Sequence, residues 1–281
     1  MKVAFVTDTG TGMHPDYWKE KGVYCLPLQI TCDGKSEDEY TQISHDQVIQ
    51  KLHEKKVLKT SLPSLGKIQD CFETLKEQGY DTIFAIPICK GLSGTLDSME
   101  MIARQLDMEF IGVDCYCTAV EEGHMIETAK EMYEQGIDMD EIVSKLEEVA
   151  ASCETVLLCD DLDHMKRGGR LTPMAATLGG LLKIKPILHI GKNTNGRVDV
   201  LDKVRTMSRA QDRVIRHLKE INVDDTFTFI VAHVDALEEA KKYAKRIEEQ
   251  IEGAKVQIID LVSAVGIHTG LGCLALQVFK K

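Results

Sequence analysis

The chain of 281 residues is 43% hydrophobic and 28% charged, which is typical of a folded globular protein and excludes a disordered or fibrous one. Its formal net charge of −11 repels the phosphate backbone of nucleic acids, so we expect no nucleic-acid partner. There is no stretch of roughly 18 consecutive apolar residues and no signal-peptide core at the start, which predicts a cytoplasmic protein. The length favours two domains that share a cleft over one large α/β domain.

The nine cysteines are scattered along the chain. An odd number without a secretory signal argues against a disulfide framework. Cys115 and Cys117 form the one close pair, but an extended segment would turn them to opposite faces, and no second Cys or His pair completes a four-ligand zinc site. We therefore interpret the cysteines as buried small hydrophobic residues and expect no metal site.

The first half of the chain alternates strand-like and helix-like segments. In chain order it predicts strands over 2–8, 22–30, 81–88 and 108–114, with Pro27 at an edge or bulge position of the second strand. It predicts helices over 44–56, 63–80, 95–106, 118–135 and 138–151. Ser44 caps the first of these helices, Ser64 caps the second, and Gly79 stops the second. The segment 81–88 is almost continuously apolar, as a strand covered by helices on both faces must be. This alternation predicts a doubly wound, mostly parallel α/β domain over residues 1–154.

The second half has a different rhythm. It predicts a strand over 154–160, two strands within 184–206 joined by an Asn-Gly turn, helices over 207–220 and 235–251, and strands over 226–234, 255–261 and 272–279. A strand pair followed by mixed helices and strands is typical of an α+β domain. We assign residues 155–281 to that second domain.

The segment "PICKGLSGT" (87–95) places Ser93 where a predicted strand has ended and a helix begins. A Gly-rich turn at the C-terminal end of a parallel strand presents backbone N–H groups and the positive end of a helix dipole, and anions bind there. Gly91 and Gly94 would allow a close backbone approach, and Thr95 adds a second hydroxyl. Three interpretations of Ser93 stay open: a nucleophile, a hydrogen-bond donor to a bound ligand, or a helix cap. Its place at a strand end favours the ligand over the cap.

Two other hydroxyl-rich segments are weaker candidates. "LKTSLPS" (58–64) puts Thr60 and Ser61 in an extended segment before the Ser64-capped helix, where exposed turn hydroxyls are the simpler explanation. "TDTGTGM" (7–13) could cradle a phosphate, but it lacks the lysine of a P-loop and the G-x-G-x-x-G spacing. We expect it to form structural turns around Asp8.

The second half holds one histidine and one basic cluster of interest. "SAVGIHTGLGCLAL" (263–276) sets His268 among glycines, which indicates a tight loop that aims the ring at a site, although a hydrogen-bonded core histidine is the alternative. "MKRGGRLTP" (165–173) gathers Lys166, Arg167 and Arg170, with Thr172 as the cap of a following helix. A basic cluster is unusual in so acidic a chain, and its alternative is a solvated turn.

The order and spacing of "KTSLPS", "GLSGT", "KRGGRLT", "LLKIKPIL" and "GIHTGLG" resemble the DegV family of bacterial fatty-acid-binding proteins, from about residue 3 to residue 279. The resemblance implies an N-terminal α/β domain and a C-terminal α+β domain, with a long-chain fatty acid in a buried tunnel between them. It also implies that the protein is not an enzyme and needs no cofactor. A separate fatty-acid kinase would phosphorylate the presented carboxylate in phospholipid precursor metabolism, with transient contact to a membrane surface.

The same resemblance assigns roles to individual residues. The proposed carboxylate site consists of Ser93, Thr60 or Ser61, the neighbouring backbone groups of Gly94 and Thr95, and His268. Arg170 and Arg205 match positions suited to the kinase interface or to support of phosphotransfer. The sequence departs from the family pattern at Thr9 of "TDTG", where the family typically has serine, at Leu271, where proline is usual, and at Cys273, where alanine is common.

A fatty acid also satisfies the energetics. Burying about fourteen methylenes at roughly 0.8 kcal/mol each gives on the order of 11 kcal/mol before ordering costs, so the tail would dominate affinity and the head group would fix orientation. The apolar segment 174–188 is our candidate for the wall of the tail pocket, with ordinary core as its alternative.

Two other classes of function compete with the carrier. A serine hydrolase acting on an acyl ester would use Ser93 and His268, which follow the Ser…Asp…His order of α/β-hydrolases, but "GLSGT" is not the G-x-S-x-G elbow because Thr95 replaces its last glycine. A phosphosugar or nucleotide enzyme would use the 91–95 turn as an anion site and would need no apolar tunnel.

Overall fold

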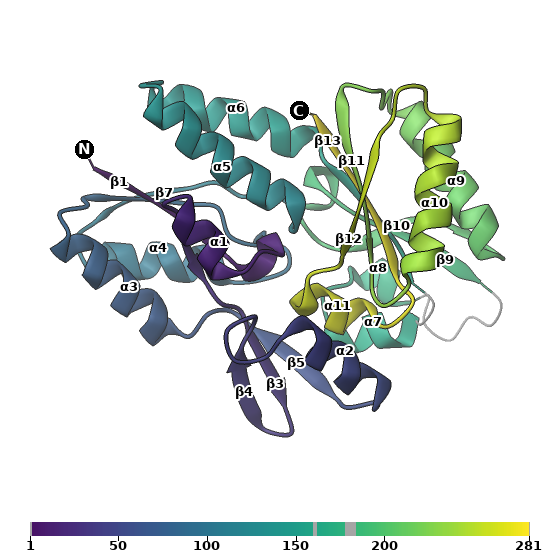
Figure 1. Cartoon of the computed structure of the whole chain (residues 1–281), viewed down its shortest axis with the longest axis horizontal. Coiled ribbons are helices and arrows are strands. Elements are labelled where there is room, and N and C mark those ends of the chain that lie inside the picture. The colour runs from purple at the N-terminus through teal and green to yellow at the C-terminus, as the bar shows by residue number, and fades with distance from the viewer. Residues whose placement is uncertain (1, 160–161, 178–183, 281) are drawn as a thin grey trace. The chain divides into compact units, whose positions relative to one another are not determined.

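The structure, a computed structural model, describes residues 2–159, 162–177 and 184–280 (Figure 1). The chain divides into two compact units, Met1–Ala150 with Val262–Ala264, and Ala151–Leu261 with Val265–Lys281. The fold class predicted from the sequence is confirmed: the first unit contains a parallel sheet with helices, and the second a mixed sheet with helices. None of the helices in the described part of the chain is both long enough and apolar enough to cross a lipid bilayer.

The parallel sheet of the first unit has the order β2 (Tyr24–Leu26), β1 (Val3–Asp8), β6 (Thr82–Ala85) and β7 (Glu109–Gly112). All three strand pairs are parallel. Every residue of β1 and β6 is buried, as the apolar run 81–88 predicted. The sheet therefore has helices on both faces.

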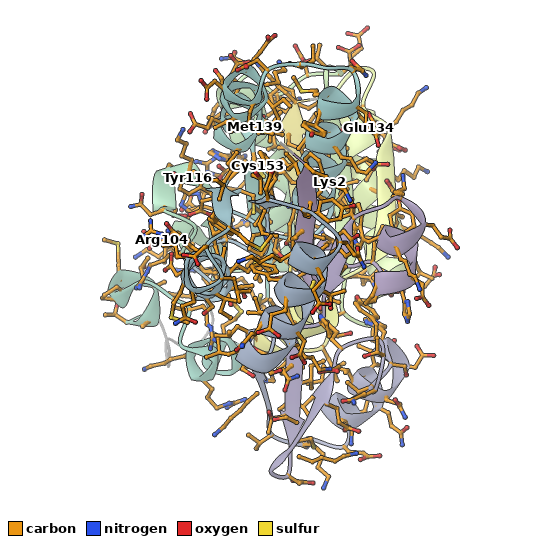
Figure 2. The ribbon with its side chains drawn as sticks, turned by 90° about the vertical axis from the view of Figure 1, so that its left-hand side faces the viewer. Lys2, Arg104, Tyr116, Glu134, Met139 and Cys153 are labelled. Carbon is orange, nitrogen blue, oxygen red and sulfur yellow. The ribbon has the colours of Figure 1, made fainter. Side chains whose placement is uncertain are left out.

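Helices α3 (Leu65–Glu77) and α4 (Thr95–Gln105) lie on one face of this sheet, and α5 (Val120–Glu134) and α6 (Met139–Ser152) on the other (Figure 1). Alternate residues of β1 serve the two faces: Val6 packs in the core with α3 and α4, whereas the Phe5 ring lies 5.5 Å from that of Tyr133 on α5. In Figure 2, Arg104 at the end of α4 and Glu134 at the end of α5 lie on either side of Lys2, which leads into β1. The first unit is thus doubly wound.

The capping residues predicted for the first unit are confirmed. Ser44 begins α2 (His45–His53) with a capping box that Gln47 completes. Ser64 accepts a hydrogen bond from the Lys67 backbone at the start of α3. Gly79 follows that helix with a φ of +83°, a conformation in which glycine carries no penalty.

The single strand predicted over 22–30 is wrong, because the structure has two strands there. β2 belongs to the parallel sheet, whereas β3 (Gln29–Cys32) belongs to a small antiparallel sheet of order β4 (Lys35–Asp38), β3, β5 (Leu58–Ser61). Pro27 lies between the two strands and has no N–H to donate to a ladder. A break between two sheets satisfies this constraint as well as the predicted edge or bulge would.

The second unit contains a six-stranded sheet in which only the pair β11 and β12 is parallel. Its order is β10 (Asp199–Val204), β9 (Lys185–Ile190), β8 (Glu154–Leu158), β13 (Leu274–Lys280), β11 (Phe227–His233) and β12 (Val256–Asp260). Helices α9 (Met207–Glu220) and α10 (Leu237–Gln250) pack on one face of it, with Val214 and Tyr243 in a shared core with Phe229 of β11.

The Asn-Gly turn of the second unit is longer than a two-residue hairpin. Asn195 and Gly196 both have the left-handed φ that such a turn requires, at +52° and +67°. A short helical turn, η2 (Lys192–Thr194), precedes them, and β10 starts only at Asp199. The chemistry of the dipeptide was predicted correctly, but the loop length was not.

Candidate functional site

Ser93 lies in the loop between β6 and α4, at the C-terminal end of the parallel sheet of the first unit. Its backbone N–H donates to the Cys89 carbonyl at 3.0 Å, and its Oγ is 2.8 Å from the Oγ1 of Thr95. The N-cap residue of α4 is Gly94, and no side chain caps the helix. Because the half-buried Ser93 hydroxyl is not used as a cap, the capping interpretation is wrong.

The turn does not need glycine at position 94 for its own backbone. Gly94 has a φ of −84°, which any residue adopts. A Cβ there would meet only Leu62, at 4.0 Å. Leu62 directly follows Thr60 and Ser61, so this contact places the end of β5 beside the Ser93 loop. The order of the two motifs along the chain does not reveal this proximity.

Thr60 and Ser61 extend from β5 to opposite faces of the small sheet, since successive residues of a strand alternate. Thr60 pairs with Ile30 of β3 and is half-buried, while Ser61 pairs with Gln29 and is exposed. The predicted extended conformation of this segment is confirmed. Only one of the two hydroxyls can share a face with a bound head group.

A group of buried acids lies behind the Ser93 loop, and sequence reasoning missed it. Asp8 is fully buried at the end of β1 and accepts hydrogen bonds from the backbone N–H groups of Gly10 and Ile88 at 2.7 and 3.3 Å. It caps the short helix η1 (Thr9–Thr11), as the predicted structural turn requires. Its carboxyl group lies beside that of Glu122, since a Cβ placed at Gly10 would come within 2.6 Å of Asp8 Oδ1 and 2.7 Å of Glu122 Oε2.

The partners of Asp8 are far away in the sequence. Glu122, in the first turn of α5, is fully buried and accepts hydrogen bonds from the hydroxyls of Thr7 and Thr118. Glu39, also fully buried, is bonded by the Thr9 hydroxyl and by the backbone N–H of Ala264. An acidic residue in the first turn of a helix is ordinarily explained by the helix dipole, so no local signal marked Glu122 as part of a cluster.

Burial controls the ionisation of these acids. Burial raises the pKa of Asp8 to about 7 and that of Glu39 to about 8, against the lowering effect of their hydrogen bonds. Burial, and then the charge of Asp8, raise the pKa of Glu122 well above its usual value. Two carboxyl groups in contact in an apolar interior cannot both ionise easily. Burial and mutual repulsion therefore both favour the protonated form in the Asp8 and Glu122 pair.

His268 lies in the short helix α11 (Ser263–Thr269), so the predicted loop is wrong. The ring packs instead on Gly168 at the end of α7 (Leu162–Gly168), which is not one of the glycines of its own segment that were expected to surround it. Burial, and then the charges of Arg170 and His164, lower the pKa of His268 to about 4. The imidazole is neutral at physiological pH, and can donate or accept a proton in a hydrogen bond but carries no charge.

The basic segment 164–170 of the second unit is partly used for structure. His164 Nε2 is 2.6 Å from the carbonyl of Ile267, and Arg167 approaches the other ring nitrogen of His164 at 3.2 Å. Arg170 donates to the Gly168 carbonyl at 2.6 Å. These contacts tie the segment to the helix that carries His268. Lys166, by contrast, is exposed.

The two arginines assigned to a kinase interface lie at different ends of one strand. The backbone of Arg170 pairs with Val198, just before β10, whereas the exposed Arg205 follows the last residue of β10. At about 3.3 Å per residue, roughly 20 Å of strand separate them. Thr172 caps the following helix α8 (Pro173–Ala176), as predicted.

The remaining candidates of the sequence analysis are the cysteines and the wall segment. Seven cysteines are buried and two, Cys25 and Cys71, are half-buried, and all nine are free thiols, so the prediction of small buried residues holds. Cys273, one of the departures from the family pattern, lies 3.3 Å from Cys159, sulfur to sulfur. Of the candidate wall 174–188, residues 178–183 lie outside the described residues.

Sequence and structure comparisons place this chain among proteins of one family. A sequence model described as "Uncharacterised protein, DegV family" matches residues 2–281. A DegV domain-containing protein of Streptococcus pneumoniae is 32% identical over 278 residues, which is 98% of each chain. A crystal structure of a fatty acid binding DegV family protein of Streptococcus agalactiae has a TM-score of 0.88 at 28% identity, and covers 100% of this chain and 99% of its own. DegV, a fatty acid binding protein of Bacillus subtilis, has a TM-score of 0.85 at 25% identity over 100% of both chains.

Proposed function

Because the chain belongs to the DegV family, we propose that it binds a long-chain fatty acid and holds the carboxylate at the Ser93 loop. The observation that carries this proposal is the Ser93 hydroxyl, which is half-buried at the C-terminal end of β6 and does not cap the helix that follows. Ligands of open α/β sheets bind at such strand ends. Relatives of similar length and fold are described as fatty-acid-binding.

The head-group site combines hydroxyls with helix N–H groups. The first N–H groups of a helix have no acceptor within the helix, and Gly94 and Thr95 stand at the start of the eleven-residue helix α4. With Ser93 and one hydroxyl of Thr60 or Ser61, they would supply the donors that a carboxylate needs. A hydrogen bond to a charged group contributes about 1.5–3 kcal/mol, which fixes the orientation of a ligand whose apolar tail supplies most of the affinity.

We assign His268, Arg170 and Arg205 to the step after binding. The protein would be a non-catalytic carrier that presents the carboxylate to a fatty-acid kinase, in the cytoplasm and with transient contact to a membrane surface. A neutral His268 suits a hydrogen bond near an acyl head group because it adds no charge of its own. Arg205 is exposed and can meet a partner protein, while Arg170 is partly committed to the Gly168 carbonyl.

A serine hydrolase draws no support from the immediate surroundings of Ser93. The hydroxyl pairs with that of Thr95, and an activated nucleophile needs a general base in that position. Labelling of Ser93 by a fluorophosphonate probe would favour the hydrolase.

Extraction of freshly purified protein under denaturing conditions, followed by mass spectrometry, tests the proposal. We expect about one long-chain fatty acid per chain. In a reconstituted assay with a fatty-acid kinase, Ser93→Ala should lower the rate of acyl phosphate formation and weaken binding modestly. Protein that retains no lipid and binds no added fatty acid would refute the carrier function.

A further inference from the structure

Two buried thiols of the second unit face each other across neighbouring strands. Leu158 of β8 pairs with Leu274 of β13 in an antiparallel ladder, and one step beyond this pair Cys159 stands opposite Cys273. Both side chains are buried, and their sulfur atoms are 3.3 Å apart. Residues directly opposite each other on neighbouring strands have Cβ atoms about 4.5–5.5 Å apart, so the strand pairing itself holds the two thiols together.

Hydrogen bonds to a third strand fix the backbone around Cys273. The N–H of Gly272 donates to the carbonyl of Val234 at 2.8 Å, and the N–H of Val234 donates to the carbonyl of Cys273 at 3.0 Å. Val234 directly follows β11, which pairs with β13 on the side away from β8. Cys273 is thus held in register on one side and faces Cys159 on the other.

A small movement separates this contact from a covalent bond. The sulfur atoms of a disulfide are about 2.05 Å apart and its Cβ atoms about 3.5–4.5 Å apart, so the two sulfurs have to approach each other by about 1.2 Å. Rotation of both side chains, with a slight approach of the two strand ends, supplies such a movement. The pair is therefore arranged for oxidation without rearrangement of the sheet.

We propose that Cys159 and Cys273 are a modification site, at which hydrogen peroxide converts two thiols to a reversible disulfide. The thiolate of one cysteine attacks an oxygen of the peroxide, the O–O bond breaks, and a sulfenic acid and one water are formed. The sulfur of the other cysteine then attacks the sulfenic sulfur, the S–S bond forms, and the S–OH oxygen leaves as a second water with the proton of that thiol. The two sulfurs lose two electrons and the peroxide gains them. A small dithiol reverses the reaction.

The surroundings of the pair decide which oxidant and which product are expected. Both sulfurs are buried, so the native fold admits an oxidant as small as hydrogen peroxide and excludes a disulfide as large as oxidised glutathione. A sulfenic acid that has a thiol in reach condenses with it, whereas an isolated one proceeds to the irreversible sulfinic acid. The contact between Cys159 and Cys273 favours the reversible product.

The disulfide would connect the segments that hold His268. Cys159 lies three positions before α7, and Cys273 lies four positions after α11. The two helices already meet where the ring of His268 packs on Gly168. A covalent link between the start of α7 and the end of α11 should therefore oppose their separation, whether or not a ligand is bound.

The test is treatment of the reduced full-length protein with a modest excess of hydrogen peroxide at pH 7.5, followed by alkylation of the remaining thiols in denaturant. The native protein should lose two of its nine thiols, and mass spectrometry of an unreduced digest should find Cys159 and Cys273 in one cross-linked pair of peptides. The link joins residues 114 positions apart, so the midpoint of urea unfolding should rise by about 1 M. Amide hydrogen exchange in α7 should become slower. A small dithiol should reverse all of these changes, and oxidised glutathione should cause none of them.

Two variants identify the cause of these changes. Cys273→Ala removes one partner and should show neither the cross-link nor the rise in the urea midpoint. Cys71→Ala is the matched control, because it removes a cysteine of α3 that is more exposed than either member of the pair, and it should behave like the native protein.

The inference is overturned if both thiols survive peroxide in the folded native protein, or if they end as separate sulfinic acids. An equal rise in the urea midpoint of Cys273→Ala would also overturn it, because another oxidation would then be responsible. If Cys273→Ala does not fold, the cross-linked peptides of the native protein decide the question.

Discussion

The ring of His268 packs directly on the backbone of Gly168. A Cβ placed at Gly168 would lie 2.6 Å from His268 Nδ1 and 3.2 Å from its Cγ, which is closer than carbon and nitrogen atoms approach each other in a packed interior. The contact joins α7 to α11 within the second unit. It also explains why glycine occurs at the last residue of α7, without any need for a special backbone conformation.

Gly168→Ala should displace the His268 ring. Adding a methyl group to a packed site costs about 1–3 kcal/mol, so we expect a lower free energy of unfolding in urea. If His268 acts near the head group, the variant should also slow acyl phosphate formation more than it weakens lipid retention. Equal loss of both activities would indicate a structural histidine.

Gly66→Ala is the matched control for this substitution. Gly66 lies in the first turn of α3, and a Cβ there would meet nothing within 4 Å. Alanine in a helix is favoured over glycine by about 0.5–1 kcal/mol, so this variant should be slightly more stable than the native protein. Destabilisation of both variants to the same extent would show that the contact with His268 is not the cause.

Ser93→Ala should affect the ligand and not the fold. Because Ser93 does not cap α4, its loss should change the free energy of unfolding of the lipid-free protein by less than about 0.5 kcal/mol. Ser64→Ala removes a hydroxyl that does cap α3, and should cost about 1 kcal/mol while leaving oleate affinity unchanged. Urea unfolding and calorimetry on the two variants distinguish a binding hydroxyl from a capping one.

The parts of the fold that follow from local chemistry could be predicted from the sequence. Ser44, Ser64 and Gly79 act within one helical turn of their own positions, so the sequence around each of them was sufficient. The break at Pro27 was detected, but not its consequence, because the sheet that a strand joins is decided by residues far away in the chain.

The candidate site was predictable from the sequence only as far as its hydroxyls. Ser93 and Thr95 stand in one short motif, whereas the acids behind them come from the ends of β1 and from α5, 114 positions apart from Asp8 to Glu122. Nothing in either local sequence distinguishes a buried carboxyl group from a helix cap or a favourable dipole contact. Tertiary packing alone brings them together.

The buried acids should make the first unit less stable as the pH rises. The pKa of Glu39 is raised in the folded state to about 8, mainly by burial, so the folded chain binds more protons than the unfolded chain between about pH 4.5 and 8. The stability contributed by the protonated group is complete below the unfolded pKa and is lost as the pH rises through the folded pKa. Glu39→Gln should therefore stabilise the protein by at least about 1 kcal/mol at pH 8.5 and have little effect at pH 5. Urea unfolding at both values measures this, and a stability gain that does not depend on pH would contradict the assignment.

The second unit should show the opposite pH dependence at Glu154. Glu154 Oε1 lies 2.9 Å from Nδ1 of His189 and 3.3 Å from Nε2 of His217. Burial on β8 raises the pKa of Glu154, but the hydrogen bonds and charge of these two histidines lower it overall. A lowered folded pKa contributes stability that is present above the unfolded pKa, near 4.5, and is lost as the pH falls through the folded value. Glu154→Gln should therefore destabilise the protein at pH 6 by about 1–3 kcal/mol, because it removes the charge that both imidazoles face, and the difference from the native protein should shrink towards pH 3.

Thr155 is the neighbouring buried residue on β8, and its hydroxyl accepts from Gln277 at 3.0 Å. Thr155→Val should lower the free energy of unfolding by the same amount at pH 6 and at pH 3. If the loss in Glu154→Gln is also independent of pH, the histidine contacts do not control the titration of Glu154.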